Sequence, residues 1–147
     1  MNRDVIIACD FASKEQTLAF LDKFEGVKPF VKIGMELFYA TNAAILTELK
    51  KRHKKIFLDL KLFDIPNTVS HALRVLTRLG VDMINVHALG GREMMSQARK
   101  AVEDEARING ITPPKLIAVT ILTSIDDAQF KDLNIVKSIP EEVVSLA

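Results

Sequence analysis

The sequence lacks the features that mark secreted and membrane proteins. It contains one cysteine, Cys9, among 147 residues, so no disulfide can form within the chain. Cys9 ends an apolar run over residues 5–9, and we expect it to be a buried apolar residue in a reducing compartment. No apolar run approaches the roughly 18 residues that a membrane-spanning helix needs, and Arg3 and Asp4 interrupt any signal-peptide start. The sequence therefore predicts a cytoplasmic protein.

An excess of charge of one sign is also lacking. Lysine and arginine number 20 against 19 acidic residues, which gives a formal net charge of +1. Such a balance offers no electrostatic basis for binding nucleic acid or an anionic membrane. The densest basic run, residues 50–55, lies where a helix is expected to end, and cations there complement the helix dipole.

Short apolar runs alternate with helix-like segments along the chain. The expected strands are residues 5–9, 30–35, 55–62, 83–89 and 115–122. The expected helices run from Ser13, in a capping box with Gln16, to Gly26; from a cap at Thr41 or Asn42; over 67–79; from 90 to about 107; and from Pro140 onward. Five such repeats predict an α/β fold with a parallel sheet.

Polar residues fall in or after each expected strand. They are Asp10, Lys32, Asp59 with Lys61, His87, and the residues from Thr120 to Thr123. In a (β/α)8 barrel the carboxyl ends of all strands meet at one mouth, whereas an open doubly wound sheet uses mainly one switch point. No glycine-rich nucleotide-binding motif follows any expected strand. The pattern therefore favours a TIM barrel.

The spacing of these units predicts an incomplete barrel. Asp10 and Thr123 lie 113 residues apart across four units, or about 28 residues per unit. Eight units would need roughly 226 residues, in line with the ~250 typical of such barrels. We therefore expect residues 1–147 to form a single domain, the N-terminal part of a TIM barrel with about its first five βα units.

The third expected strand carries two opposite charges. Asp59 and Lys61 share one face, roughly 6–7 Å apart at about 3.3 Å per residue, and Asp64 follows at the strand's end. Burying such charges costs on the order of several kcal/mol per ion. Two hypotheses follow: a buried structural ion pair, or a charged site that positions a substrate.

The chemistry of the charged set favours the second hypothesis. A lysine flanked by carboxylates is held protonated, which suits a proton donor better than a nucleophile. A carboxylate such as Asp59 can face an anionic group that leaves as CO2, while a nearby ammonium such as Lys61 stabilises and protonates the carbanion. This chemistry needs no metal or organic cofactor, and the sequence contains no obvious metal-binding cluster.

The run Asp-Leu-Lys-Leu-Phe-Asp-Ile-Pro-Asn-Thr at positions 59–68 resembles the signature of the orotidine 5′-phosphate decarboxylase family. The resemblance extends over essentially the whole chain, as the N-terminal portion of the family's barrel. It includes Ala-Cys-Asp-Phe at 8–11, Phe-Val-Lys-Ile-Gly at 30–34, Asn-Val-His-Ala at 85–88 and Val-Thr-Ile-Leu-Thr-Ser at 119–124.

This resemblance implies a role for each charged residue. Lys61 would be the general acid that protonates C6 of the pyrimidine after CO2 leaves, and Asp59 would sit against the departing carboxylate. Lys32 would orient Asp59 and contact the ribose. Asp10 would hold a ribose hydroxyl, and Thr123 would bind the pyrimidine ring. The product would be uridine 5′-monophosphate, in the last step of de novo pyrimidine synthesis, with no cofactor.

The resemblance also implies a homodimer with its active site at the interface. Asp64, Ile65 and Thr68 would reach into the partner's site. The family's phosphate-binding residues come from later strands and loops that have no counterpart in these 147 residues. Because binding of a remote phosphate offsets the strain at the reacting centre, we expect the chain alone to be inactive or nearly so.

Two other functions stay open from the sequence. One is a Mg²⁺-dependent sugar-phosphate decarboxylase of the same superfamily, and the other is a non-catalytic half-barrel that acts as an interaction module. Retention of all the charges speaks against the module, because a scaffold could replace them with apolar residues. His87 is expected to hydrogen-bond a loop rather than act as an acid or base. Asp10 and Thr123 could instead cap the turns or helices that follow them.

Overall fold

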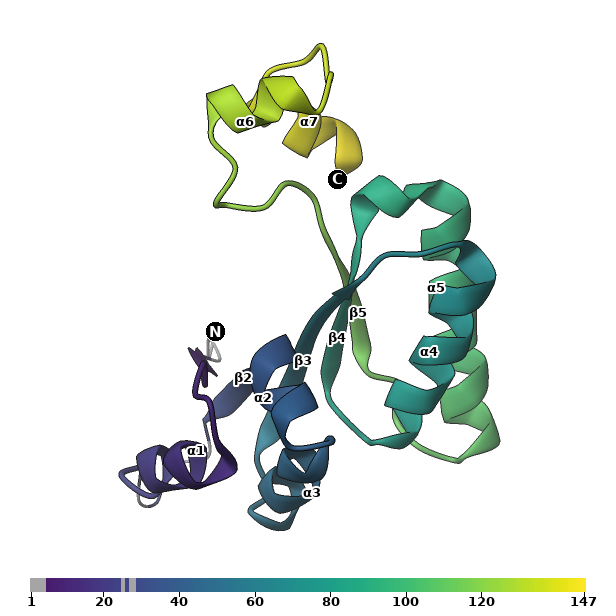
Figure 1. The fold of residues 1–147 in the computed structure, drawn as a ribbon. Coiled ribbons are helices and arrows are strands. Elements are labelled where there is room, and N and C mark those ends of the chain that lie inside the picture. The colour runs from purple at the N-terminus through teal and green to yellow at the C-terminus, as the bar shows by residue number, and fades with distance from the viewer. Residues whose placement is uncertain (1–4, 25, 27–28) are drawn as a thin grey trace.

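Five parallel strands form one sheet in the computed structural model, which describes residues 5–24, 26 and 29–147 (Figure 1). The strands are β1 (Ile6–Ala8), β2 (Phe30–Gly34), β3 (Lys55–Leu62), β4 (Met83–His87) and β5 (Lys115–Val119). Their order in the sheet is β1-β2-β3-β4-β5, and every neighbouring pair is parallel. Each crossover thus steps one strand in the same direction, as in a barrel, whereas a doubly wound sheet reverses its order. The predicted α/β fold, part of a (β/α)8 barrel, is confirmed.

Helices occupy the connections between the strands, and two more follow β5. They are α1 (Lys14–Leu21), α2 (Met35–Ala40), α3 (Ala44–Lys51), α4 (Pro66–Arg78), the short 3-10 helix η1 (Ala88–Gly90), α5 (Gly91–Ile108), α6 (Asp127–Asp132) and α7 (Ile139–Leu146). Helices α4 and α5 lie side by side along one face of the sheet, while α6 and α7 lie beyond the carboxyl ends of the strands (Figure 1).

Alternation along the strands separates a buried face from an open one. Val31, Ile33, Ile56, Leu58 and Ile84 are completely buried in the core. The intervening positions point to the other face, where they are less covered, as Lys32 and Ile117 show. Because the helices cover only the first face, the polar side chains of the second face remain accessible at the carboxyl ends of the strands.

Several predicted boundaries agree with the structure. Strand β3 spans the residues that the sequence indicated, and α4, α5 and α7 begin and end within a residue or two of expectation where bounds were given. Ser13 is the N-cap of α1 and accepts the Gln16 backbone N–H at 3.2 Å, the first half of the expected capping box. These segments carry their signals locally, in apolar periodicity and capping residues.

The prediction for the end of the first helix was wrong. Helix α1 ends at Leu21 instead of Gly26, although Gly26 does adopt the left-handed backbone (φ +73°) that favours glycine. Phe24 lies outside the helix and still packs edge-on against Phe20, with ring centroids 5.3 Å apart. The apolar spacing therefore continues past the last helical turn.

The predicted cap after the second strand was also wrong. Residues 35–40 form α2, which the sequence did not predict, and Thr41 ends this helix by donating its hydroxyl to Leu37 O at 2.7 Å. Asn42 and Ala43 follow with positive φ angles of 47° and 64°, and Ala43 is the N-cap of α3. Two successive left-handed residues turn the chain, so the helix begins without a side-chain cap.

The last strand and its connection differ as well. β5 ends at Val119 instead of residue 122, so residues 120–123 belong to the loop that follows. Likewise β4 ends at His87, because residues 88–90 form η1. Helix α6, which the sequence did not predict, begins with a capping box between Asp126 and Gln129.

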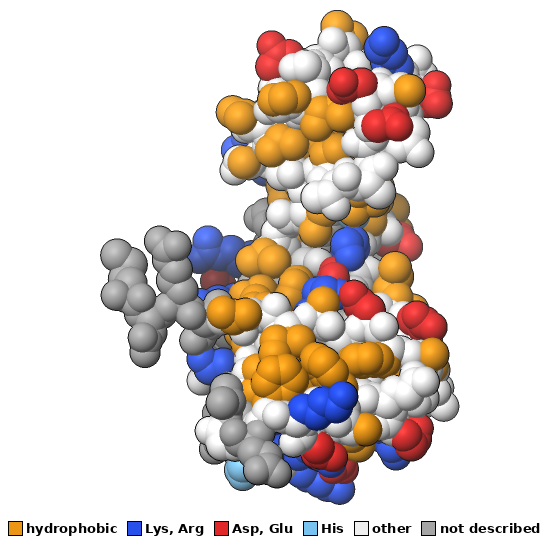
Figure 2. Space-filling model, turned by 90° about the vertical axis from the view of Figure 1, so that its left-hand side faces the viewer, with side chains coloured by type: hydrophobic (Ala, Val, Ile, Leu, Met, Phe, Trp, Pro, Cys, Tyr) orange, Lys and Arg blue, Asp and Glu red, His pale blue; other side chains and the backbone are white. Residues whose placement is uncertain are grey.

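Helices α6 and α7 form a separate lobe. A narrow waist joins this lobe to the body of the molecule, and hydrophobic side chains appear on its surface (Figure 2). No residue of α7 is buried, and Val144 is exposed. Across the described residues, none of the helices combines the length and the apolar character needed to cross a membrane.

Candidate active site

A bulge in β3 shapes the centre of the candidate site. Leu58 pairs with Ile84 on β4, and the next paired residues are Leu62 and Val86. Three residues of β3, Asp59 to Lys61, therefore lie opposite the single residue Asn85. Lys61 has a φ angle of +51°, in the left-handed region that costs a side-chain-bearing residue energy. Bulges of this kind re-aim side chains next to active sites.

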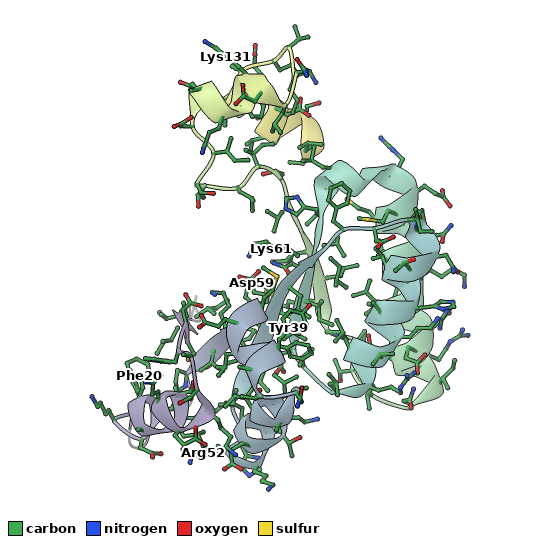
Figure 3. All side chains as sticks on the ribbon, in the orientation of Figure 1. Phe20, Tyr39, Arg52, Asp59, Lys61 and Lys131 are labelled. Atoms are coloured by element: carbon green, nitrogen blue, oxygen red, sulfur yellow. The ribbon has the colours of Figure 1, made fainter. Side chains whose placement is uncertain are left out.

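The bulge directs two charges of β3 into a charged cluster. Asp59 and Lys61 project from the strand toward the same side (Figure 3), and their side chains meet at 2.7 Å. Lys32 Nζ lies 3.5 Å from the other carboxylate oxygen of Asp59 and 2.9 Å from Asp10 Oδ1. Strands β2 and β3, with the segment just after β1, thus contribute a chain of alternating charges, Asp10–Lys32–Asp59–Lys61, with Asp59 between two ammonium groups.

Asp59 is the least exposed member of this cluster. Its side chain is 11% exposed, whereas that of Asp10 is 66% exposed. Burial by itself would raise the pKa of Asp59, but hydrogen bonds from Lys61 and Asn85 and the charge of Lys32 hold it below its ordinary value. Burial by itself would lower the pKa of Lys32, and Asp10 with Asp59 outweighs this and raises it. Asp59 is therefore an ionised carboxylate held by two cations.

Asn85 belongs to the site although the sequence did not single it out for a role. It is 2% exposed, donates from Nδ2 to Asp59 Oδ1 at 2.6 Å, and accepts the Lys61 backbone N–H at Oδ1 (2.8 Å). The sequence does contain a signal for Asn85: it is an amide inside the apolar strand Met83–His87, and asparagine is depleted in strands. Asn85 and His87 are two residues apart on β4, so their side chains point to the same open face of the sheet.

The charged cluster borders a cavity of about 240 Å³ at the carboxyl ends of β1 to β3. Its walls include Asp10, Lys32, Asp59, Lys61 and Met35. Larger cavities of about 370 Å³ and 430 Å³ lie between α5 and β5 and at the amino ends of the strands, away from this cluster. The cavity at the cluster is below the ~300–1,000 Å³ usual for small-molecule sites, so it accommodates part of a nucleotide-sized ligand.

The other predicted site residues lie outside the cluster. Asp64, Ile65 and Thr68 are exposed on the connection from β3 into α4, where Asp64 Oδ1 accepts the Ile65 backbone N–H at 2.6 Å. Thr123 is exposed in the turn that follows β5. The structure thus brings together Asp10, Lys32, Asp59 and Lys61. It leaves Asp64, Ile65, Thr68 and Thr123 at the surface, outside the cluster, and their predicted roles stay predictions.

His87 packs against an aromatic ring. Its ring centroid lies 5.8 Å from that of Phe63, and its buried Nδ1 has no hydrogen-bond partner among the described residues, so Nδ1 does not make the expected bond to a loop. Burial, and then the charge of Lys61, lower the pKa of His87 below its ordinary value. The imidazole is therefore held neutral beside the charged cluster.

The arrangement suits a reaction in which an anionic group is lost. An ionised Asp59 repels a second anion placed in the cavity, and departure of that anion as a neutral molecule relieves the repulsion. The Lys61 side chain is 31% exposed and lines the same cavity, so its ammonium can meet a reacting atom placed there. In the described part of the chain, no group of three or more His, Cys, Asp or Glu side chains is placed to hold a metal ion.

Comparisons with known proteins agree with this geometry. The sequence profile of the orotidine 5′-phosphate decarboxylase / HUMPS family matches residues 3–147. Orotidine 5′-phosphate decarboxylase from Bacillus cereus is 49% identical over 148 residues, which cover 100% of this chain and 62% of the relative's length.

Solved structures give the same result. The crystal structure of orotidine 5′-phosphate decarboxylase from Lactobacillus acidophilus is 41% identical, with a TM-score of 0.92 over 99% of this chain and 66% of that one. An uncharacterized conserved protein from Geobacillus kaustophilus is 45% identical, with a TM-score of 0.90 over 97% of this chain and 66% of that one. The match to the family profile over nearly the whole chain, supported by these relatives, shows that the chain belongs to the orotidine 5′-phosphate decarboxylase / HUMPS family.

Proposed function

We propose that this chain supplies the charged part of the active site of an orotidine 5′-phosphate decarboxylase. The enzyme would convert orotidine 5′-phosphate to uridine 5′-monophosphate and CO2 in de novo pyrimidine synthesis, in the cytoplasm. The observation that carries the proposal is the Asp59 carboxylate, held between the Lys32 and Lys61 ammonium groups at the edge of a cavity. The 49% identity to a decarboxylase of this name supports it.

The proposed reaction follows from the charges. The substrate carboxylate lies beside Asp59, where two negative charges repel each other. The bond from C6 to the carboxylate breaks, CO2 leaves, and the electron pair stays on C6. Lys61 then transfers a proton from Nζ to C6 and regains one from solvent. The ammonium stabilises the developing carbanion before the transfer, so the reaction needs no cofactor.

The neighbouring residues would bind the rest of the nucleotide. Lys32 holds Asp59 in place and contacts the ribose, and Asp10, which is mostly exposed and bonded to Lys32, accepts a ribose hydroxyl. Thr123 contacts the pyrimidine from the loop after β5. These roles need the substrate to span from β1 to β5 across the open face of the sheet, which the order of the strands allows.

We further propose that the protein is a homodimer whose partner completes each site. Asp64, Ile65 and Thr68 are exposed next to β3, in a position to reach a second copy. Apolar side chains are exposed at the same end of the molecule: Met35, Tyr39, Phe63, Ile65 and Leu89. Burial of this surface would stabilise a dimer, since each large apolar side chain contributes roughly 1.5–3 kcal/mol when fully covered.

The main experiment uses a complete barrel. The chain spans 62% of the length of its curated relatives, so residues 1–147 would be joined in frame to the remaining C-terminal portion of the Bacillus cereus relative. We call this protein the joined barrel. Its consumption of orotidine 5′-phosphate is followed by absorbance, with the 147-residue chain measured beside it. We expect turnover by the joined barrel and little or none by the chain alone.

Two controls separate the competing functions. Turnover should survive a metal chelator, and loss of turnover on chelation would favour the Mg²⁺-dependent sugar-phosphate branch. A folded joined barrel that neither decarboxylates the nucleotide nor binds uridine 5′-monophosphate at millimolar concentration would favour the interaction module and contradict the proposal.

The shared site has its own test. Joined barrels carrying Lys61→Ala and Asp64→Ala are each expected to be inactive. Mixing them under conditions of subunit exchange should restore part of the activity, because one mixed site retains both residues. Verified exchange with no recovery would show that Asp64 does not act across the dimer.

A further inference from the structure

Asn85 occupies the one place on β4 that faces the whole bulge of β3. The ladder pairs Leu58 with Ile84 and then Leu62 with Val86, so β3 inserts extra residues while β4 contributes only Asn85. A bulge of this kind leaves backbone groups without ladder partners. The Lys61 N–H is one such group, and a buried N–H without a partner is costly.

The Asn85 side chain replaces the missing ladder bond. Its Oδ1 accepts the Lys61 N–H at 2.8 Å, at the residue whose φ angle is +51°. The backbone strain at Lys61 is therefore countered by a bond from a side chain that is itself 2% exposed. A left-handed lysine persists only where its surroundings determine it, and here Asn85 is the contact that does so.

The same amide also holds the Asp59 carboxylate. Asn85 Nδ2 lies 2.6 Å from Asp59 Oδ1, the oxygen that also accepts from Lys61 Nζ at 2.7 Å. The two partners fix the orientation of the amide, because a backbone N–H can only donate and an ionised carboxylate can only accept. One planar group thus sets both the backbone at Lys61 and the direction of Asp59.

We propose that Asn85 is a positioning residue for the decarboxylation, coupling the backbone at Lys61 to the carboxylate of Asp59. The inference rests on the proposed function. Asn85 does not touch the reacting atoms; it fixes where the Lys61 side chain leaves the strand and which way the Asp59 oxygens face. A loss of this bridge would misplace both groups together, and a misplacement of about 1 Å can cost on the order of 100-fold in rate.

Two variants of the joined barrel test the bridge. Asn85→Leu keeps the branched arrangement of the side-chain heavy atoms and makes neither bond. Asn85→Asp can still accept the Lys61 N–H but presents a second carboxylate to Asp59. The matched control is Asn109→Leu, because Asn109, the C-cap of α5, makes the same kind of amide–carboxylate contact with Glu105 at 2.9 Å.

For Asn85→Leu we expect kcat to fall roughly 10- to 100-fold per folded site, with KM changed much less, since the groups that react are displaced. Asn109→Leu should retain the parent's kcat. If Asn85 were only a core residue, Asn85→Leu would lose stability while each folded site kept the parent's kcat. That result would overturn the inference.

Asn85→Asp tests the contact between Asn85 and Asp59 through the pH profile. Two adjacent carboxylates share a proton over part of the pH range where Asp59 alone is ionised, even with Lys32 and Lys61 beside it. His87 on the same strand and Asp10 beyond Lys32 are unchanged. The acid limb of kcat/KM should therefore move to higher pH. An unmoved limb in an active variant would contradict the bridge.

The backbone half of the bridge can be measured without turnover. In the parent joined barrel, the Lys61 amide should be protected from hydrogen exchange, as a bonded N–H is, and Asn85→Asp should retain part of this protection. Free exchange at Lys61 in the folded parent would overturn the inference. An inactive parent with a protected Lys61 amide would instead count against the proposed function alone.

Discussion

Two buried carboxylates of this molecule have nearly the same set of partners. Asp59 on β3 binds two cations and one asparagine: Lys32 at 3.5 Å, Lys61 at 2.7 Å and Asn85 at 2.6 Å. Glu105 on α5 does likewise, with Arg74 at 3.5 Å, Arg78 at 2.8 Å and Asn109 at 2.9 Å. The side chains are 11% and 9% exposed. Cations hold the pKa of both carboxyls below their ordinary values, Arg78 foremost at Glu105.

The partners and the backbone distinguish the two clusters. Glu105 lies on a regular helix and links it to α4 through arginines, whose fixed charge and planar donors suit a structural pair. Asp59 lies on a bulged strand beside a left-handed Lys61, and its cations are lysines that can release a proton. A cavity borders Asp59. A buried, paired carboxylate is therefore not by itself a sign of function; the strained backbone, the lysines and the cavity are.

The largest expected difference between the clusters is in catalysis. In the joined barrel, Lys61→Met should lower kcat by at least about 10³-fold, because it removes both the proton donor and the charge beside the carbanion. The matched change at the other cluster, Arg78→Met, should leave kcat within about twofold of the parent. The absorbance assay measures both. Similar losses in the two variants would erase the functional distinction between the clusters.

A smaller effect is expected at the Glu105 cluster, and it concerns stability instead of catalysis. Glu105→Gln weakens the link between α4 and α5, and we expect the midpoint of thermal unfolding to fall by a few degrees, up to about 5 °C. Its kcat should not change. Circular dichroism on heating, with the assay run on the same sample, tests this. An unchanged midpoint would show that the Glu105 cluster contributes no stability.

The stability contributed by the two clusters should differ in its dependence on alkaline pH, whereas in acid the two should behave alike. Both carboxyls have lowered pKa values, so both contribute stability at neutral pH and lose it in acid. The pKa of Lys32 is raised above 10.5 in the folded protein, so its contribution is full below pH 10.5 and is lost as pH rises through the folded pKa. Arginine keeps its proton there.

The measurement compares free energies of unfolding in urea at pH 7 and near pH 11. The difference between the parent and Lys32→Met should shrink at the higher pH, while that between the parent and Arg78→Met should stay constant. Ionisation of other groups is common to each pair and cancels. A Lys32 difference that does not change with pH would mean that its pairing with Asp10 and Asp59 contributes little.

The last prediction concerns the thiol behind the Asp59 cluster, where catalysis is not affected. Burial, and then the charge of Asp10, raise the pKa of Cys9 to about 11 from its ordinary 9.0. At pH 8 the folded protein should therefore react with iodoacetamide far more slowly than the urea-unfolded protein. Mass spectrometry of timed samples measures the labelling. Equal rates in the two states would show that the core side of the cavity is open.

Local patterns predicted most of the fold. The apolar run of β3, the cap at Ser13, the helix start at Pro140, and the alternation of strands and helices could all be read in the sequence. The prediction failed where the chain turns by strained residues, as at Asn42 and Ala43, and where a short helix such as α2 begins without a cap. Such features depend on how neighbouring elements pack.

The sequence predicted the four charged residues that meet in the candidate site, but not the asparagine that holds two of them in place. Asp10, Lys32, Asp59 and Lys61 were found because polar residues at the ends of apolar strands stand out, and the resemblance of residues 59–68 to a family signature gave them roles. Asn85 was missed, because its two partners lie 24 and 26 positions away along the chain. No pattern within β4 states which atoms of β3 it will meet.

The sequence by itself therefore determined the alternation of strands and helices, which follows from periodicity along a single chain, and the identity of the charged residues. Only the tertiary structure decided which of two similar carboxylates faces a cavity, and that a bulge turns Lys61 into the left-handed region opposite Asn85. The reason is physical. Register between strands is set by long-range pairing and by the burial of a whole face, and neither is written in any one segment.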